Sequence, residues 1–242
     1  MKIDLEKEDY IRAFTVERKP DAARSALVLV DLQYATGSRQ GALGRRLKAQ
    51  GSATADYRFE RIERFVVPNA RRLLEAWRAA GRRVLFVTIG ATLPDCSDAP
   101  PHMRKLFLEL QNYAGSREHE IIDELKPVRG EAVVNKTSNG AFATSGIDSV
   151  LRAWNCDQLY LLGVSTNMCV DTTAREAADR GYAVTLIEDA CGTTQPMLHE
   201  AAMINFQRLF GRVRSTERPL NENACHARSE DDTAVLQPRT TT

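Results

Sequence analysis

Apolar residues along the chain fall into two kinds of segment that alternate. Residues 26–31 are apolar up to a final aspartate, which predicts a strand buried on both faces. Residues 59–80 instead carry apolar side chains three and four positions apart, which predicts a helix that ends before Gly81. The pattern then predicts further strands at 83–89, 132–135, 159–163, 183–188 and 212–215, and further helices at 103–110, 147–154, 167–180 and 197–210.

Strands that alternate with helices are typical of parallel β-α-β units joined by right-handed crossovers. We therefore expect one α/β domain, with a doubly wound, mainly parallel sheet of six strands and helices on both faces. This domain is expected at residues 23–216, between an N-terminal extension (1–22) and a polar C-terminal tail (217–242). Residues 35–57, rich in Gly, Ser, Arg and Gln, are expected to form a long loop after the first strand, a candidate lid.

Composition narrows the class of protein. The 242 residues are 43% hydrophobic and 27% charged, and 33 Lys and Arg against 32 Asp and Glu leave a formal charge of +1. This balance predicts no basic surface for nucleic acid or an anionic membrane. No apolar run approaches the ~18 residues of a membrane span, and the acidic N-terminus does not resemble a signal peptide. The five cysteines form no CxxC pair, so we expect reduced thiols in a cytoplasmic protein without a zinc site.

Three reactive side chains stand where predicted strands end. Asp31 ends the first strand, Lys136 follows the third and Cys169 follows the fourth. Ligands of an open parallel sheet bind at the carboxyl ends of its strands, where these side chains would meet. Cys169 also falls in the first turn of a predicted helix, whose dipole stabilises a thiolate. Because an aspartate can accept the thiol proton and a lysine favours both anions, the three residues predict a thiol nucleophile.

Each of these residues also has a structural interpretation, as a buried cysteine, a turn-forming aspartate or a solvated lysine. Cys191 is the rival nucleophile, because it too follows a predicted strand, although no helix begins beside it. The other cysteines are interpreted as having no part in the chemistry. No histidine stands at a strand end, so no Cys–His pair is expected. The residues set aside in this way are Cys96, Cys156, Cys225, His119, His199 and His226. His102, in a loop beside Pro100 and Pro101, is the best placed of the histidines.

Three motifs carry a resemblance to a known family: ALVLVDLQ (26–33), NKTSNGAF (135–142) and GVSTNMCV (163–170). With these motifs the chain resembles the isochorismatase-like cysteine hydrolases. The resemblance implies a Rossmann-like α/β fold and a catalytic triad of Asp31, Lys136 and Cys169. It also implies a cis peptide bond before Ser165, and backbone N–H groups of Ser165 and Cys169 directed at the substrate oxygen. The family further implies a thioester intermediate, no cofactor, and homo-oligomers, often tetramers.

Departures from the family's subgroups bear on the substrate. Nicotinamidases carry metal-binding histidines after the first strand, whereas here no histidine occurs before His102, so no metal is expected. The Thr-Asn-x-Cys pattern at 166–169 is more similar to ureidoacrylate amidohydrolase and biuret hydrolase, and N-carbamoylsarcosine amidase belongs to the same group. The resemblance therefore implies a small amide, ureido or carbamoyl substrate. Its candidate contacts are Gln207, Asn167 and Gln33.

Other functions remain open at this point. The chain could be a nicotinamidase-like or other amide hydrolase of the same fold, or a catalytically silent binding relative. A redox-sensing protein that pairs Cys169 with Cys191 is a further alternative. A dinucleotide-binding enzyme is disfavoured, because the first strand is followed by LQYATG and not by the GxGxxG that approaches a pyrophosphate.

Overall fold

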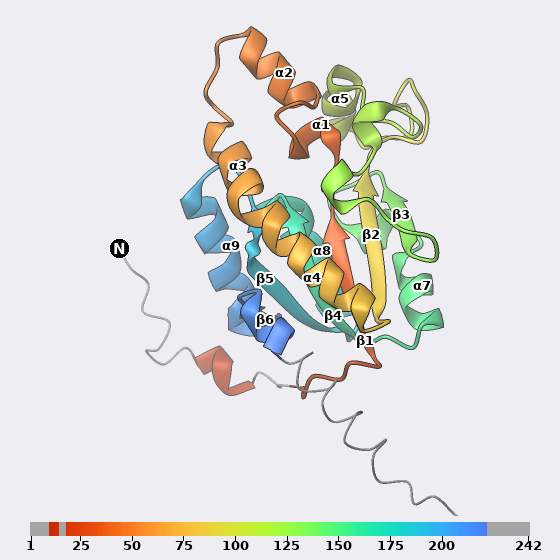
Figure 1. Cartoon of the computed structure of the whole chain (residues 1–242), viewed down its shortest axis with the longest axis vertical. Helices are drawn as coiled ribbons and strands as arrows, with labels where there is room; N and C mark the ends of the chain where they lie inside the picture. Colours follow the sequence, from red (N-terminus) through yellow and green to blue (C-terminus); the bar gives the residue numbers. More distant parts are fainter. Residues whose placement is uncertain (1–9, 15–17, 222–242) are drawn as a thin grey trace, which may run out of the picture.

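The computed structural model describes residues 10–14 and 18–221, which form an α/β fold (Figure 1). Its six strands make one sheet in the order β3-β2-β1-β4-β5-β6, and every neighbouring pair is parallel. The prediction of a doubly wound, six-stranded sheet is confirmed, and the sheet is parallel throughout. The strands are β1 (Ser25–Val30), β2 (Arg83–Ile89), β3 (Ala132–Lys136), β4 (Gln158–Val164), β5 (Ala183–Gly192) and β6 (Gly211–Arg214).

Helices cover both faces of this sheet. The α-helices are α1 (Tyr34–Gly37), α2 (Ala42–Ala49), α3 (Asp56–Arg61), α4 (Val67–Ala79), α5 (Pro101–Leu110), α6 (Ala141–Thr144), α7 (Ile147–Ala153), α8 (Asp171–Asp179) and α9 (Pro196–Leu209). Shorter 3-10 or π turns are η1 (Tyr10–Phe14), η2 (Ile62–Val66), η3 (Arg117–His119), η4 (Asp123–Leu125) and η5 (Thr166–Val170). Helix α4 crosses one face of the sheet, and α8 lies on the other (Figure 1).

Strand β1 lies at the centre of the sheet, between β2 and β4. All six of its residues are buried, as its continuously apolar sequence predicts for a strand covered on both faces. Trp77 of α4 packs edge-on against Tyr160 of β4, with ring centroids 5.3 Å apart. The buried centre of the sheet therefore fixes where the carboxyl ends of β1 and β4 lie.

The segment 35–57 is not the long loop that we expected. It contains most of α1, all of α2 and the start of α3, which together lie beyond the carboxyl ends of the strands (top of Figure 1). A distant residue stabilises it: the buried Glu118 carboxylate accepts from the backbone N–H of Ala42 at 2.7 Å and from Arg45 at 2.8 Å. The prediction failed because α2 depends on this tertiary contact, which local sequence does not reveal.

Several boundaries also differ from the predictions. The helix expected at 59–80 begins at Asp56 and contains the π turn η2. Strand β5 extends to Gly192, beyond the predicted end at 188, because it continues to pair with β4 after a register shift. In the expected tail, residues 217–221 are helical and Leu220 packs against the core; the rest of the tail lies outside the described residues. The proposed division into extension, domain and tail remains a prediction.

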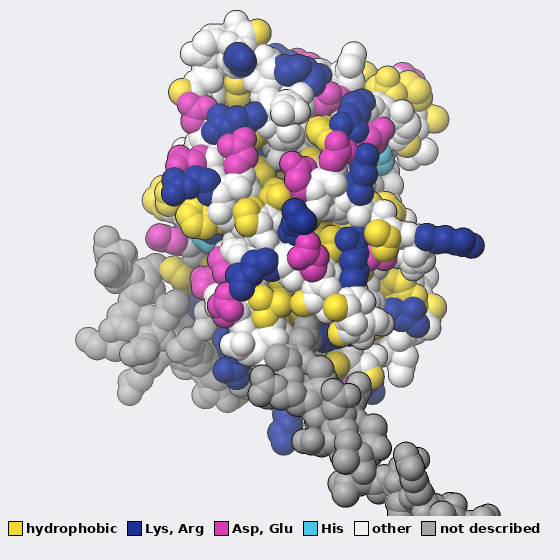
Figure 2. Space-filling view, in the orientation of Figure 1, with side chains coloured by type: hydrophobic (Ala, Val, Ile, Leu, Met, Phe, Trp, Pro, Cys, Tyr) yellow, Lys and Arg dark blue, Asp and Glu magenta, His cyan; other side chains and the backbone are white. Residues whose placement is uncertain are grey.

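The surface fits the near-neutral composition. On the face shown in Figure 2, cationic and anionic side chains are interspersed over the whole described surface. Within the described part of the chain, no helix has the length and apolar character needed to cross a membrane.

Gly163 allows β4 to approach β1 closely. Its φ is +127°, and a Cβ placed there would lie 2.1 Å from the carbonyl oxygen of Val30. Both features exclude a side chain, because L-residues rarely adopt this conformation and the neighbouring atom is backbone. The residues that follow Gly163 lead into the turn that carries Cys169.

We expect Gly163→Ala to lower the free energy of unfolding by at least about 2 kcal/mol, because overpacking and backbone strain add. Denaturant unfolding would measure the loss. The matched control is Gly146→Ala, since a Cβ at Gly146 meets nothing within 4 Å. Equal stability of the two variants would show that β4 can move away from β1 without cost.

Candidate active site

The structure brings Asp31 and Lys136 together at the carboxyl edge of the sheet. Asp31 directly follows β1, and Lys136 is the last residue of β3. The Lys136 Nζ atom lies 2.9 Å from Asp31 Oδ2, and the exposed fractions of the two side chains are 0% and 3%. Nζ also donates to the carbonyl oxygen of Ser138 at 3.0 Å. This edge therefore contains a buried, hydrogen-bonded ion pair.

Asp31 keeps one carboxylate oxygen available. Its backbone has φ +54°, a left-handed conformation that aspartate tolerates better than most residues and that occurs often at functional sites. Oδ2 accepts from Lys136, whereas Oδ1 is buried and has no hydrogen-bond partner. Burial raises the pKa of Asp31, against the opposing effect of the Lys136 charge. Asp31 is therefore well suited to accept a proton.

Cys169 lies in η5, immediately beyond β4, and is 8% exposed. Its thiol donates to Asn139 Oδ1 at an Sγ–O distance of 3.6 Å. Burial, followed by the negative charge of Asp31, raises the pKa of Cys169 to about 12, although Lys136 acts in the opposite direction. The sequence analysis expected the helix start to favour the thiolate. In the folded protein burial and the Asp31 charge instead favour the neutral thiol.

Ser165 precedes this turn. The peptide bond between Val164 and Ser165 is cis. The carbonyl oxygen of Ser165 accepts from the backbone N–H groups of Met168 at 3.0 Å and Val170 at 3.2 Å, which closes the turn around Cys169. These bonds fix the turn that carries Cys169 to the end of β4.

Arg58 of α3 is a site residue that the sequence analysis missed. The side chain is buried, its Nη1 donates to Ser165 Oγ at 2.6 Å, and its Nε donates to the carbonyl oxygen of Thr36 at 3.0 Å. Burial lowers the pKa of Arg58 to about 10, while the charge of Asp31, and of Cys169 once it is ionised, favours the protonated form of Arg58. One sequence signal was available: Arg58 falls on the buried stripe of its helix, beside Phe59 and four positions before Ile62.

His199, in the first turn of α9, also lies near the turn that carries Cys169. Its Nδ1 is 3.0 Å from Thr166 Oγ1, and its Nε2 is 3.0 Å from Arg61 Nη2. Because a guanidinium only donates, Nε2 must accept, and Nδ1 carries the proton and donates to Thr166. Burial and the Arg61 charge lower the pKa of His199 to about 4. His199 is therefore a neutral group that holds Thr166, with neither nitrogen free to act on Cys169.

Gln33, an expected substrate contact, bonds to backbone groups through both ends of its side-chain amide. Its side-chain amide donates to the carbonyl oxygens of Ile89 at 3.1 Å and His119 at 2.8 Å. Its Oε1 accepts from the backbone N–H of Ile89 at 2.7 Å. Both amide hydrogens are thus used by backbone groups. Gln33 joins the end of β1 to the end of β2, which helps to fix Asp31.

The other two expected substrate contacts differ in position. Asn167 lies in η5, and its Oδ1 accepts from Thr193 Oγ1 at 2.6 Å. Gln207 lies eleven residues after Pro196, the first residue of α9, which corresponds to roughly 16 Å along the helix. Since α9 runs back toward the edge where β6 begins, the structure does not bring Gln207 to Asp31, Lys136 and Cys169.

The remaining cysteines and histidines that the structure describes do not form a second site of this kind. Cys191 lies inside β5 with no exposed surface, and burial raises its pKa to about 12. Cys96 and Cys156 are buried free thiols, whereas Cys225 lies outside the described residues. Among the residues that the structure describes, no three His, Cys, Asp or Glu side chains are grouped so that they could hold a metal ion.

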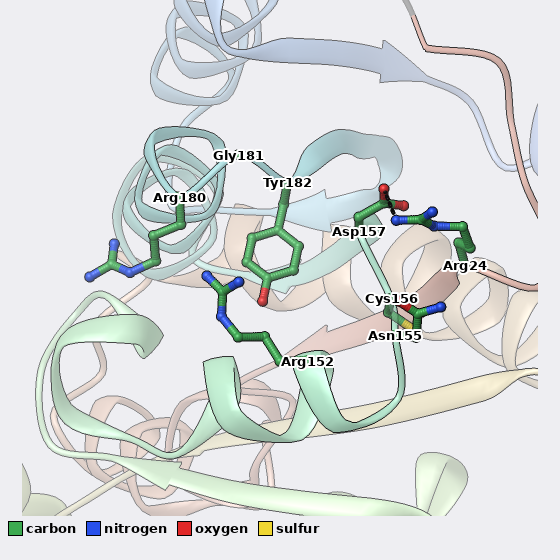
Figure 3. Close-up of a pocket in the computed structure, with 8 residues that line it drawn as sticks. All are labelled: Arg24, Arg152, Asn155, Cys156, Asp157, Arg180, Gly181 and Tyr182. Atoms are coloured by element: carbon green, nitrogen blue, oxygen red, sulfur yellow. Dashed lines mark hydrogen bonds and ion pairs between the residues drawn. The ribbon is translucent and has the colours of Figure 1, made fainter.

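A cavity of about 310 Å³ lies at the opposite edge of the sheet, where β4 and β5 begin (Figure 3). Two of the arginines that line it have carboxylate partners: Arg24 pairs with Asp157 at 2.6 Å, and Arg152 pairs with Asp148 at 2.7 Å. None of the residues predicted from the sequence for the active site lines this cavity. We therefore place the candidate active site at the carboxyl edge.

Comparison with known proteins shows the family to which the chain belongs. Residues 25–218 match the family model of the isochorismatase domain. A ureidoacrylate amidohydrolase from Caulobacter segnis is 31% identical over 212 residues, which cover 81% of this chain and 84% of the relative. A cysteine hydrolase from Pseudomonas syringae has a similar structure, with a TM-score of 0.72, 25% identity, and coverage of 87% of this chain and 97% of the other.

An N-carbamoylsarcosine amidase from Thermoplasma acidophilum is also similar, with a TM-score of 0.61, 25% identity, and coverage of 81% of this chain and 98% of the other. The matching region contains the whole parallel sheet together with Asp31, Lys136 and Cys169. The family match extends over most of the chain, and the fold is shared with solved members. The chain therefore belongs to the isochorismatase family of hydrolases.

Proposed function

We propose that the protein is a cysteine amidohydrolase that cleaves a C–N bond of a small amide, ureido or carbamoyl compound. The observation that carries this proposal is the buried Oδ1 of Asp31, which has no hydrogen-bond partner and lies near the Cys169 thiol. The ion pair between Oδ2 and Lys136 holds this carboxylate in place. A carboxylate in this environment can take a proton from the thiol and later return it. The relatives named above act on ureidoacrylate and N-carbamoylsarcosine, which supports a linear ureido or carbamoyl substrate.

The first step forms a covalent bond. Asp31 accepts the thiol proton, and the Cys169 sulfur attacks the substrate carbonyl carbon, whose oxygen becomes an oxyanion. Backbone N–H groups of Ser165 and Cys169 are the proposed donors to this oxygen. Because the proton moves between two members of the site, its net charge does not change, and Lys136 stabilises the arrangement throughout.

The second step breaks the C–N bond. The protonated Asp31 gives its proton to the leaving nitrogen, so that ammonia or an amine departs and a thioester remains on Cys169. Asp31, now ionised, takes a proton from water as the water attacks the thioester. The acid product leaves and the thiol is restored. All protons in this cycle pass through Asp31, and no cofactor or metal takes part.

Ammonia release tests the proposal directly. The panel contains simple ureas, carbamoyl amino acids, biuret, maleamate and nicotinamide. We expect linear carbamoyl or ureido compounds to be the best substrates, with Asn167 as a proposed contact. A hundredfold preference for nicotinamide would favour the nicotinamidase-like alternative, and no hydrolysis of any member would favour the silent binding relative. The proposed homo-oligomer, a tetramer by analogy with the family, is checked by the solution mass.

Cys169→Ser is expected to abolish turnover and leave the unfolding midpoint nearly unchanged, because the hydroxyl has a similar size but is a far weaker nucleophile here. The control is Cys191→Ser, which changes a buried thiol inside β5. We expect this variant to keep kcat within a few-fold of the parent wherever it folds. Loss of activity in folded Cys191→Ser, with Cys169→Ser still active, would assign the nucleophile to Cys191.

Asp31→Asn is expected to separate thiol reactivity from hydrolysis. Hydrolysis should fall by roughly 10²–10⁴-fold, because the proton acceptor and donor is lost. Alkylation of Cys169 by iodoacetamide at neutral pH should become faster, since the Asp31 charge contributes to the high pKa of the thiol and Lys136 remains. Mass spectrometry of the labelled peptide follows the reaction. Slower alkylation in Asp31→Asn would mean that Asp31 maintains a thiolate in the resting enzyme.

The pH dependence of kcat/KM should follow the pair formed by Asp31 and Cys169, which is active with one proton between them. Because burial raises the pKa of Asp31, the acid limb should lie above the ordinary aspartate value of about 3.9. Activity is lost as the pH falls through this limb, where both groups are protonated. The thiol pKa of about 12 places the alkaline limb far above neutrality. An acid limb at or below the ordinary value would contradict the assigned role of Asp31.

A further inference from the structure

In the part of the chain that the structure describes, buried charges are few, and one of them has no ion-pair partner. Among the described residues, the buried Asp, Glu, Lys and Arg side chains are Asp31, Arg58, Glu118 and Lys136. Lys136 pairs with Asp31, and Glu118 pairs with Arg45. Arg58 forms no ion pair. A buried guanidinium without a carboxylate is unfavourable, so its presence at this edge of the sheet needs an explanation.

The hydrogen bonds of Arg58 hold it in place without satisfying it. A guanidinium has five N–H groups. One is donated to the carbonyl oxygen of Thr36 and one to Ser165 Oγ, both neutral acceptors, which leaves three. No group in the described part of the chain accepts from these three. The side chain is thus fixed on one side by Thr36 of α1 and by Ser165. The second terminal nitrogen, Nη2, is still available to donate hydrogen bonds.

The charges at the site do not balance. Asp31 contributes −1, while Lys136 and Arg58 contribute +1 each, so the sum is +1 with Cys169 as a thiol. Transfer of the thiol proton to Asp31 leaves this sum unchanged. A neutral substrate would leave an excess positive charge buried during the whole reaction. A substrate with one negative charge would neutralise it.

We propose that Arg58 binds a carboxylate of the substrate, and that the substrate is therefore a short carbamoyl or amido acid and not a neutral amide. This inference rests on the proposed function. The planar guanidinium matches a carboxylate through paired N–H···O bonds. Because Arg58 contacts Ser165, whose backbone N–H is a proposed oxyanion donor, the carboxylate lies only a few carbon atoms from the reacting carbonyl.

Arg58 could instead act on the reacting atoms, by stabilising the oxyanion or the thiolate. That role would help every substrate equally, whether charged or neutral. The two roles are distinguished by substrates that share the same carbamoyl group and chain length and differ only in charge.

The test uses N-carbamoyl-β-alanine and N-carbamoylglycine, each against the neutral alcohol of the same length, 3-ureidopropanol or 2-ureidoethanol. Ammonia release reports cleavage of the same group in all four. We expect the parent enzyme to prefer one or both acids by roughly 10²-fold in kcat/KM, the discrimination typical of a hydrogen bond to a charged group. Arg58→Gln should remove this preference, mainly through KM for the acids, so that kcat/KM falls at least about tenfold more for the acids than for the alcohols.

Arg39→Gln is the matched control, because it removes a cation from the same segment. Arg39 is at the surface, where it pairs with Asp56 at 3.2 Å and with Glu63 at 2.9 Å. The preference for the acids should persist in this variant. An equal loss on acids and alcohols in Arg58→Gln, or a parent enzyme that does not distinguish them, would overturn the proposal. If Arg58→Gln does not fold, Arg58→Lys serves, and it should retain at least a tenth of the preference.

A binding measurement separates this inference from the proposed function. Calorimetry with Cys169→Ser, which is expected not to turn over, should detect binding of the acids. In the double variant that also carries Arg58→Gln, this binding should be weaker by roughly 10²-fold. If the parent hydrolyses none of the compounds but binds the acids through Arg58, the proposed function fails and the carboxylate site stands. If hydrolysis occurs and the binding of the acids is independent of Arg58, the carboxylate site fails and the proposed function stands.

Discussion

The buried ion pair between Lys136 and Asp31 is the constraint on which the candidate site depends. Lys136 ends β3 and Asp31 follows β1, with β2 between them in the sheet. Neighbouring strands lie about 4.8 Å apart, so the two backbones are separated by roughly 10 Å, which the lysine and aspartate side chains span together. A buried pair is stable only with good geometry and further hydrogen bonds. The second bond from Nζ to Ser138 supplies one, and Gln33 fixes the end of β1 against β2. The order and alignment of the central strands therefore determine where a proton can be held.

The same burial decides which groups of the site are charged. Desolvation raises the pKa of Asp31 and of Cys169, so both favour their neutral forms, while the Lys136 charge opposes this for both. These opposing effects on the two pKa values favour a site in which the carboxylate and the thiol together carry one proton. The dipole at the start of a short turn is a smaller effect than the transfer of a thiolate out of water. The chemistry of the site thus arises from the environment of the three residues as much as from their identity.

Helices α1, α2 and α3 connect this edge of the sheet to the rest of the chain. Glu118, which is far from α2 in sequence, accepts hydrogen bonds from α2. Arg58 of α3 donates to Ser165, which directly precedes the turn that carries Cys169. His199, from α9, holds the next residue, Thr166. The turn that carries Cys169 is consequently contacted by elements from both halves of the sheet. One of these contacts places a second buried cation at the site, which changes the kind of molecule that it suits.

The sequence by itself determined the sheet and the position of three candidate reactive residues at its carboxyl edge. Continuous apolar segments such as 26–30 have one favourable arrangement, a strand covered on both faces, and the ends of parallel strands meet at one edge; Asp31, Lys136 and Cys169 could be found for that reason. Only the tertiary structure decided the helical form of 35–57, the structural role of Gln33, the distance of Gln207 from the edge and the burial of Arg58. Each of these depends on a partner far away in sequence, such as Glu118 for Ala42 or Ser165 for Arg58. Periodicity reports which face of an element is buried, but it does not report which distant polar group will lie against that face, because that is set by the packing of the whole chain.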